Sequence, residues 1–369
     1  MSITLGTSFY LGIPASTKNS AYDCVSMAAD EGIRHFFTTV QMPEADISGH
    51  LQQFREIAEL AAKMDLRIMA DAHPIAFKRV GGSVSDLEPF RAIGITDLRL
   101  DAGFSDEDIA GLQHSATQLG MTITLNASAM KAQTIERLNQ MNFPLEGSVA
   151  CHNYYPRIES GMSTEFIRQQ AELLHEHGIK IAAFAASEHC HRYITYEGLP
   201  TLEVHRAIRP DLACRELLTR QWADIVYIGD QTDDREELRR FMTVAQSPHL
   251  VLRMRLNPLC GEAERDIALN RIHEHLPQDF EVTYRARGDR QRPELLFIAP
   301  QSQNVAREMG TVAVDNALYP RYSGEIHIAK KNLPLDPRTN VVGRIIEDDL
   351  RLLDAINPGT SFAFEAVDL

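Results

Sequence analysis

Residues 67–104 read RIMADAHPIAFKRVGGSVSDLEPFRAIGITDLRLDAGF, and this stretch contains the unit that repeats through the first two thirds of the chain. Two short apolar runs, Arg67–Ala70 and Asp97–Leu100, flank a longer amphipathic segment, which is typical of a strand, a helix and a second strand. Each run ends in a carboxylate, Asp71 after the first and Asp101 after the second. Alternation of this kind predicts parallel strands, because a helix carries the chain back between two strands of the same direction.

The same alternation continues from the start of the chain to about residue 247, with helical spacing in segments such as Asp46–Met64 and Ser163–His177. The predicted strands are Ile3–Tyr10, Arg34–Val40, Arg67–Ala70, Asp97–Leu100, Thr122–Leu125, Gly147–Cys151, Lys180–Phe184 and Ile225–Ile228. Eight such units in about 250 residues favour an α/β fold of the closed (β/α)8 type. The alternative is an open doubly wound sheet, which usually carries GxGxxG after its first strand. Residues 5–16, LGTSFYLGIPAS, do not fit that pattern.

The pattern changes after Ser247, and at 369 residues the chain is too long for a single core. We therefore predict a catalytic barrel over residues 1–247 and a small β-rich domain over residues 248–369. The second domain is expected to hold one helix, Glu347–Ala355, and the strands Leu250–Met254, Glu281–Ala286, Glu294–Ile298, Gly324–Ala329 and Phe362–Glu365.

Composition excludes several classes of function. The net charge of -14 argues against nucleic acid as a partner, although a few arginines in one cleft can still hold an anionic small molecule. No apolar run approaches the roughly 20 residues of a membrane helix, and the first residues lack the features of a secretory signal. The five cysteines are scattered without a CxxC pair, which speaks against a disulfide framework. We expect a soluble cytoplasmic enzyme with no membrane partner.

The sequence offers little for metal, serine or nucleotide chemistry. His189, Cys190 and His191 have the side chains of metal ligands, but adjacent residues point in different directions, so no metal and no cofactor are expected. Neither GxSxG nor GxxxxGK(S/T) occurs. Carboxylate chemistry remains, and it is the usual means of acid–base cleavage of an acetal.

Polar residues follow nearly every predicted strand, at the end of the barrel where such folds place their chemistry. These residues are Tyr10, Glu44, Asp71, His73, Asp101, Asn126, His152, Asn153, Tyr155, Arg157, Glu197, Thr201, Glu203, His205, Arg206 and Asp230. A single Asp after a strand is often only a helix cap, and we interpret Asp230 in that way. Asp101 differs, because Gly103 and Phe104 separate it from the next helix. For Asn126 the sequence favours neither of two interpretations, a residue that stabilises its loop or a site residue.

Several long motifs resemble those of the 6-phospho-N-acetylmuramidases of the MupG type. In the barrel they are LGTSFY, HFFTTVQMPEAD, RIMADAHP, LRLDAGF, LNAS, ACHNYYPR, YEGLPTLEVHR and YIGD; after it they are VDNALYPRYSGEIHIAKKNLP, DPRTNVVGRI and INPGTSFAF. The resemblance implies a TIM barrel followed by a cyclophilin-like β domain. It also implies intracellular hydrolysis of the β-1,4 bond in 6-phospho-N-acetylmuramyl-N-acetylglucosamine during cell-wall recycling.

For such a reaction we predict Asp71 and Asp101 as the catalytic pair, with Glu203 and Glu44 in reserve. Guanidinium groups bind phosphate and carboxylate well, so Arg157 and Arg206, with His205, are predicted to hold the phosphate and the lactyl carboxylate. The remaining predicted substrate contacts are Tyr10, Asn126, His152, Asn153, Tyr155, Glu197, Thr201 and, from the second domain, Arg321, which with Asn316 and Tyr322 either closes the cleft or packs at an interface.

Two alternatives remain open from the sequence. One is a barrel that binds a phosphosugar without turning it over, and the other is a hydrolase of a different 6-phosphorylated disaccharide. A sugar-phosphate lyase or isomerase would normally need a lysine or a metal, and no predicted strand ends in lysine.

Overall fold

The computed structural model describes residues 3–13, 17–40, 47–193, 195–286, 297–302 and 305–368. The chain divides into two compact units, Met1–Ser247 and Pro248–Leu369. Within the described ranges, no helix combines the length and the apolar character that crossing a membrane requires.

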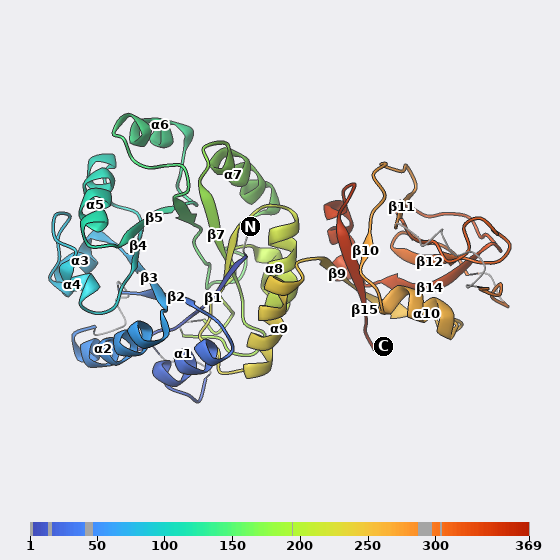
Figure 1. The fold of residues 1–369 in the computed structure, drawn as a ribbon, viewed down its shortest axis with the longest axis horizontal. Coiled ribbons are helices and arrows are strands. Elements are labelled where there is room, and N and C mark those ends of the chain that lie inside the picture. Colours follow the sequence, from blue (N-terminus) through green and yellow to red (C-terminus); the bar gives the residue numbers. More distant parts are fainter. Residues whose placement is uncertain are drawn as a thin grey trace. The chain divides into compact units, whose positions relative to one another are not determined.

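The first unit is a closed barrel of eight parallel strands in chain order, in which the last strand pairs with the first (Figure 1). The predicted (β/α)8 fold is therefore confirmed. The strands are β1 (Thr4–Ser8), β2 (His35–Thr39), β3 (Arg67–Ala72), β4 (Asp97–Leu100), β5 (Thr122–Asn126), β6 (Val149–Cys151), β7 (Lys180–Ala185) and β8 (Ile225–Ile228).

Helices surround the barrel on its outer side (Figure 1). They are α1 (Ala21–Asp30), α2 (Ile47–Met64), α3 (Pro74–Val80), α4 (Glu88–Arg91), α5 (Asp106–Gln118), α6 (Ala132–Gln140), α7 (Thr164–Glu176), η1 (Glu203–His205), α8 (Pro210–Thr219) and α9 (Arg235–Gln246). Local chemistry fixes several of their starts. Ser105 and Asp108 form a capping box at α5, and Asp234 caps α9 by accepting two backbone N–H groups. The cap of α9 is therefore not Asp230, and the interpretation of Asp230 as a helix cap is wrong.

Alternate residues of each strand face opposite sides of the barrel wall. In β2, Phe36 packs in the layer between strands and helices, whereas Phe37 packs inside the barrel. In β4, Leu98 and Leu100 join the outer layer. Successive side chains of a strand point to opposite faces. Because Leu98 and Leu100 point outward to the helices, Arg99 between them points into the barrel. This periodicity decides which side chains reach the site.

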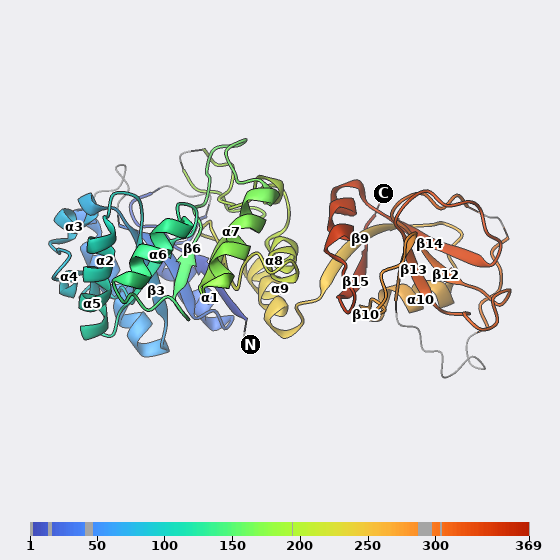
Figure 2. The same cartoon turned by 90° about the horizontal axis from the view of Figure 1, so that it is seen from above.

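The second unit is a seven-stranded mixed sheet in the order β10-β15-β9-β14-β12-β13-β11. Its elements are β9 (Leu250–Leu256), α10 (Glu262–Leu269), β10 (His273–Glu274), β11 (Thr283–Arg285), β12 (Thr311–Asp315), β13 (Ile326–Ala329), β14 (Thr339–Ile345), η2 (Glu347–Ala355) and β15 (Ser361–Ala366). Helix α10 packs against β14 and β15. Figure 2 shows the elements of this unit from a second direction. The expectation of a β-rich domain is confirmed, while its likeness to cyclophilin stays a prediction.

The details of this unit differ from the sequence-based expectation. The segment 262–269 forms a helix that we did not predict, and the predicted helix Glu347–Ala355 is of the 3-10 type. Strands β10, β12 and β14 were also missed. Part of the predicted strand Glu294–Ile298 lies outside the described residues.

Candidate active site

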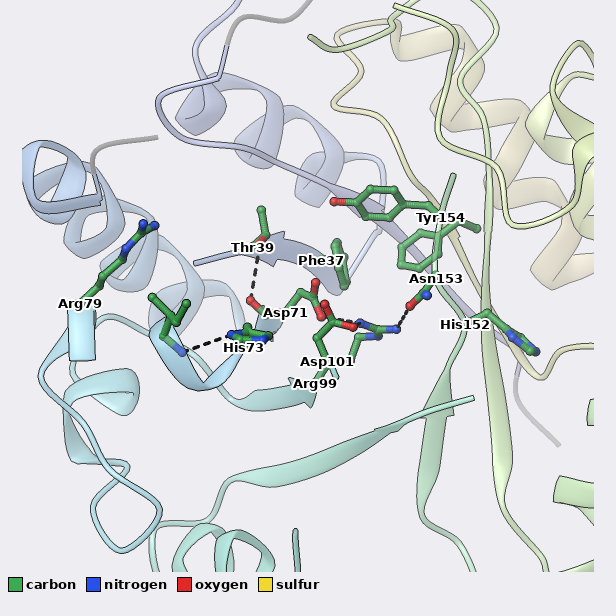
Figure 3. A pocket seen from close by; sticks show the side chains of 12 residues that line it. Phe37, Thr39, Asp71, His73, Arg79, Arg99, Asp101, His152, Asn153 and Tyr154 are labelled. Carbon is green, nitrogen blue, oxygen red and sulfur yellow. Dashed lines mark hydrogen bonds and ion pairs between the residues drawn. The ribbon is translucent and has the colours of Figure 1, made fainter. Parts of the chain in front are cut away.

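A cavity of about 490 Å³ opens at the carboxyl ends of the barrel strands. It is lined by Phe37, Thr39, Asp71, His73, Ile75, Arg79, Arg99, Asp101, His152, Asn153, Tyr154 and Phe184 (Figure 3). The lining comes from β2, β3, β4, β7 and the segments that follow β3, β4 and β6. The structure therefore brings together four of the predicted site residues: Asp71, Asp101, His152 and Asn153.

Arg99 lines this cavity and connects its polar side chains. It pairs in register with Asp71 of the neighbouring strand, and its Nη1 forms an ion pair with Asp71 Oδ1. The same Nη1 lies 3.8 Å from Asp101 Oδ1, and Nη2 donates to Asn153 Oδ1. The remaining donors reach the carbonyl oxygen of Cys151, from Nε at 3.3 Å and from Nη2 at 3.2 Å. Figure 3 shows the two aspartates on one side of this guanidinium and Asn153 on the other.

The two carboxyl groups have different surroundings. Asp71 is buried, and burial raises the pKa of its carboxyl group; the Arg99 guanidinium opposes this rise, and the nearby Asp101 charge adds to it. The side chain of Asp101 is 30% exposed, and its Oδ1 accepts a hydrogen bond of 3.2 Å from Asn126 Nδ2. Burial alone would lower the pKa of Arg99, but the charge of Asp71 raises it, so this guanidinium stays cationic.

Asn126 and Ser128 connect the strand ends on the β5–β6 side. Asn126 Oδ1 accepts the backbone N–H of Ser128, and Ser128 Oγ accepts the backbone N–H of Asn153 at 2.8 Å. Asn126 therefore braces its loop and contacts Asp101 at the same time. His152 Nδ1 lies 3.3 Å from Ser128 Oγ, and the ring points away from the two aspartates (Figure 3). Burial, followed by the charge of Arg99, lowers the pKa of His152 to about 3, so its imidazole is neutral.

Aromatic rings form one wall of the cavity. Phe37, Tyr154 and Phe184 contact one another edge to face, with ring centroids 4.8–5.9 Å apart. Such packing fixes the rings and leaves an apolar surface on which a sugar ring can lie. On another side, His73 caps α3 and Gly103 leaves room for it, because a Cβ at Gly103 would lie 3.1 Å from His73 Nε2.

Glu203 and Arg206 lie outside the lining of this cavity and form an ion pair in the loop after β7. Two bonds of 2.6 and 2.7 Å join the guanidinium to the carboxylate, which also accepts the backbone N–H groups of Glu159 and Gly161. Hydrogen bonds from Arg206 and from these amides lower the pKa of Glu203 to about 2. Arg206 further donates to the carbonyl oxygens of Tyr155, Arg157, Glu197 and Gly198. Both side chains are thus engaged in holding two loops together.

The other predicted contacts are distributed as follows. His205 is fully buried, and its Nε2 lies 2.9 Å from Glu216 Oε2. Thr201 Oγ1 donates to Asn153 O and accepts from Phe184 N, so it joins β7 to the neighbouring loop. Tyr155 packs against the outer layer of the barrel, and Tyr10 is buried behind the cavity. The remaining three, Arg157, Glu197 and Arg321, are exposed, and Glu44 lies outside the described residues.

Sequence reasoning missed Arg99, the residue that links the catalytic candidates. The signal was present in the run DLRLD, where a charged residue stands between two leucines of a buried strand. With a period of two, the leucines face the helices and the arginine must face the interior. Sequence reasoning also missed the aromatic residues Phe37, Tyr154 and Phe184 and the rim residues Thr39, Ile75 and Arg79. It named His73 only as a polar residue that follows a strand.

Within the described ranges, no group of three or more His, Cys, Asp or Glu side chains is arranged to hold a metal ion. His191 instead lies 2.9 Å from Ser187 O and 3.1 Å from Tyr196 O, and Cys190 Sγ lies 3.4 Å from Asp233 Oδ1. The arrangement in the cavity suits acid–base chemistry: two carboxyl groups in different environments, joined by one cation.

Comparison with known proteins agrees with this chemistry. The family described as "6-phospho-N-acetylmuramidase, N-terminal" matches residues 5–243, and the one described as "6-phospho-N-acetylmuramidase, C-terminal" matches residues 250–365. The crystal structure of an uncharacterized B. cereus protein is 26% identical, with a TM-score of 0.83 and 100% of both chains covered. That of a conserved Enterococcus faecalis protein of unknown function is 30% identical, with a TM-score of 0.73, covering 98% of this chain and 96% of the other. No curated protein matches the sequence.

Proposed function

The chain belongs to the 6-phospho-N-acetylmuramidase family, and from this premise we propose that it hydrolyses the β-1,4 bond of 6-phospho-N-acetylmuramyl-N-acetylglucosamine in peptidoglycan recycling. The family makes the chain a glycosidase and implies a phosphosugar substrate. The products of the proposed reaction are N-acetylmuramic acid 6-phosphate and N-acetylglucosamine. We place the reaction in the cytoplasm, where the five cysteines, all free thiols, would stay reduced.

One observation supports the chemistry above all: Asp71 and Asp101 both approach the same Arg99 nitrogen, Nη1, at the ends of neighbouring strands. Glycosidases generally use two carboxyl groups that flank the bond to be cleaved. A cavity of about 490 Å³ is within the usual range for small-molecule sites, and its aromatic wall suits a sugar ring.

We assign the proton donor to Asp71. Burial raises the pKa of this carboxyl group, so it takes up a proton more readily than an exposed aspartate, as a general acid requires, and it pairs with Arg99 while it is ionised. The proton passes to the glycosidic oxygen as the bond between that oxygen and the anomeric carbon breaks. The carboxylate left on Asp71 is then stabilised by the Arg99 guanidinium beside it.

We assign the stabilisation of charge on the sugar to Asp101. Its side chain is partly exposed, accepts a hydrogen bond from Asn126 and lies 3.8 Å from Arg99 Nη1. This carboxylate stabilises the positive charge that develops on the sugar ring. Water supplies the hydroxyl group of the new reducing end, and the proton that this water loses passes to the carboxylate of Asp71 and restores the acid.

Turnover of a chromogenic N-acetylmuramic acid glycoside, with and without a 6-phosphate, tests the proposal. The purified full-length protein should release the chromophore from the phosphorylated compound and not from the other. Release from neither, by a protein shown to be folded, would contradict the proposed substrate. It would redirect the search to other 6-phosphorylated disaccharides.

A further inference from the structure

A second arginine, Arg192, is buried at the carboxyl ends of β7 and β8, with only 4% of its surface exposed. Its guanidinium lies over the rings of two tyrosines, 4.7 Å from the centroid of Tyr10 and 5.4 Å from that of Tyr154. Nη2 donates to Tyr154 Oη at 3.2 Å, and Nη1 donates to the carbonyl oxygen of Tyr193 at 2.7 Å. A buried cation is therefore held against Tyr154, a residue that lines the cavity.

Among the described residues, no carboxylate is bonded to the guanidinium of this arginine. In the part of the chain that the structure describes, no carboxylate forms an ion pair with Arg192, and its buried Nε–H has no acceptor. A buried charge is ordinarily paired, because removing it from water is costly. Stacking on two tyrosines offsets only part of that cost.

The nearby acid does not fill this role. Asp230 is fully buried, but its Oδ2 accepts the backbone N–H groups of Ser187 and Leu199, and its Oδ1 accepts the backbone N–H of Arg192 at 3.4 Å. The carboxylate thus bonds to backbone amides of the loop, and it acts on the guanidinium only through its charge.

The position of Arg192 points to a ligand. The ring of Tyr154 lines the cavity that holds Asp71 and Asp101, and contacts with Phe37 and Phe184 fix that ring. Tyr154 Oη accepts a hydrogen bond from Arg192, so the guanidinium is in direct contact with a side chain that lines the cavity. Barrels of this type frequently bind phosphate groups between the loops that follow strands 7 and 8, where Arg192 lies.

We propose that Arg192 and the hydroxyl group of Tyr154 form the subsite for the phosphate group of the substrate. The inference rests on the proposed function and names the residues that make it specific for a phosphorylated sugar. A phosphate at this wall accepts the phenolic proton of Tyr154 and lies in the field of the guanidinium, where low exposure to water strengthens the attraction.

Of the three residues predicted for this task, Arg206 and His205 are engaged elsewhere and Arg157 is exposed. Arg206 is bound by Glu203 and by four carbonyl oxygens, and His205 is paired with Glu216. Arg99 is held by Asp71 and Asn153. Arg192 differs from these because its bonds within the described chain are to neutral oxygens.

Calorimetric titration of the full-length protein with N-acetylmuramic acid 6-phosphate and with N-acetylmuramic acid tests the subsite without requiring turnover. Arg192→Gln should weaken binding of the phosphorylated sugar about 100-fold and leave binding of the other sugar nearly unchanged. Tyr154→Phe keeps the ring and the stack, and should weaken binding of the phosphorylated sugar about 10-fold. Arg168→Gln, on the exposed face of α7, is the matched control and should change neither affinity.

Equal losses for both sugars would mean that Arg192 only holds the loop, and would overturn the subsite. If Arg192→Gln does not fold, Tyr154→Phe decides: unchanged affinity for the phosphorylated sugar rejects the inference. A wild-type protein that binds both sugars equally rejects it as well. A wild type that cleaves neither glycoside, but prefers the phosphorylated sugar through Arg192, contradicts the proposed function and leaves the subsite intact.

Discussion

Asp71 and Arg99 occupy paired positions on neighbouring strands of the barrel, and their side chains meet as an ion pair inside it. Both side chains are nearly inaccessible to water, so each depends on the other for compensation of its charge. Parallel pairing of β3 with β4 sets this contact, and the same register carries Asp101 to the cavity two residues later.

Removal of one member of this pair should destabilise the protein strongly. Arg99→Met leaves the Asp71 carboxylate buried without a partner, for which we expect a loss of about 3–5 kcal/mol in the free energy of unfolding. The double variant Arg99→Met with Asp71→Asn should recover much of that loss, because no uncompensated charge remains. Urea unfolding of the single and double variants measures the coupling. Additive losses would show that the ion pair contributes little.

The assignment of acid and carboxylate predicts a dependence on the leaving group. Asp71→Asn should slow cleavage of the natural disaccharide by about 10²–10⁴-fold, because its leaving oxygen needs a proton. The same variant should lose much less on a 4-nitrophenyl glycoside of the 6-phosphorylated sugar, whose leaving group departs without one. Asp101→Asn should lose similar factors on both substrates. Interchanged results for the two variants would reverse the roles.

The sequence predicts the barrel well, because eight repeats of one pattern reinforce one another and each strand is short, buried and followed by a helix. It predicts the second unit less well. Strand β10 has two residues, too few to show a period, and β12 is buried on both faces, so it lacks the alternation that marks a strand. The pairing of these strands is decided by contacts between segments distant in the chain.

Dependence on contacts between distant segments also explains which of the predicted site residues line the cavity and which do not. Asp71 and Asp101 follow strands directly, so the barrel geometry alone brings them to one edge. Glu203 belongs to a long loop after β7, where position in the chain does not fix the direction of a side chain. There it pairs with Arg206, three residues further on. Arg192 lies in the same loop, and its stacking on Tyr10 requires the tertiary fold.

Glu203 should matter for stability at neutral pH and less for turnover. Its pKa in the folded protein is about 2, below the usual value of 4.5, so folding favours its ionised form. The resulting stabilisation is fully present above pH 4.5 and is lost as the pH falls toward 2. Glu203→Gln should therefore lower the free energy of unfolding by about 1–2 kcal/mol at pH 7, after allowance for solvent screening, with a smaller effect near pH 3. A loss of more than 10³-fold in kcat with unchanged stability would instead identify Glu203 as a catalytic acid.

His152 should make the protein sensitive to mild acid. Its pKa is about 3 in the folded state and 6.5 in the unfolded state, because burial disfavours the imidazolium. As the pH falls from 6.5 toward 3, His152 therefore binds a proton in the unfolded chain but stays neutral in the folded protein. The free energy of unfolding should decrease by up to about 1.4 kcal/mol per pH unit. His152→Asn can keep the contact with Ser128 and cannot take up this proton.

This variant should be less stable than the wild type at pH 7.5, and the difference between their free energies of unfolding should shrink as the pH falls to 5. Urea unfolding at pH 7.5, 6 and 5 measures this trend, and His114→Asn on the exposed face of α5 controls for the loss of a histidine. Parallel pH profiles for wild type and His152→Asn would show that the imidazole of the folded protein accepts a proton after all.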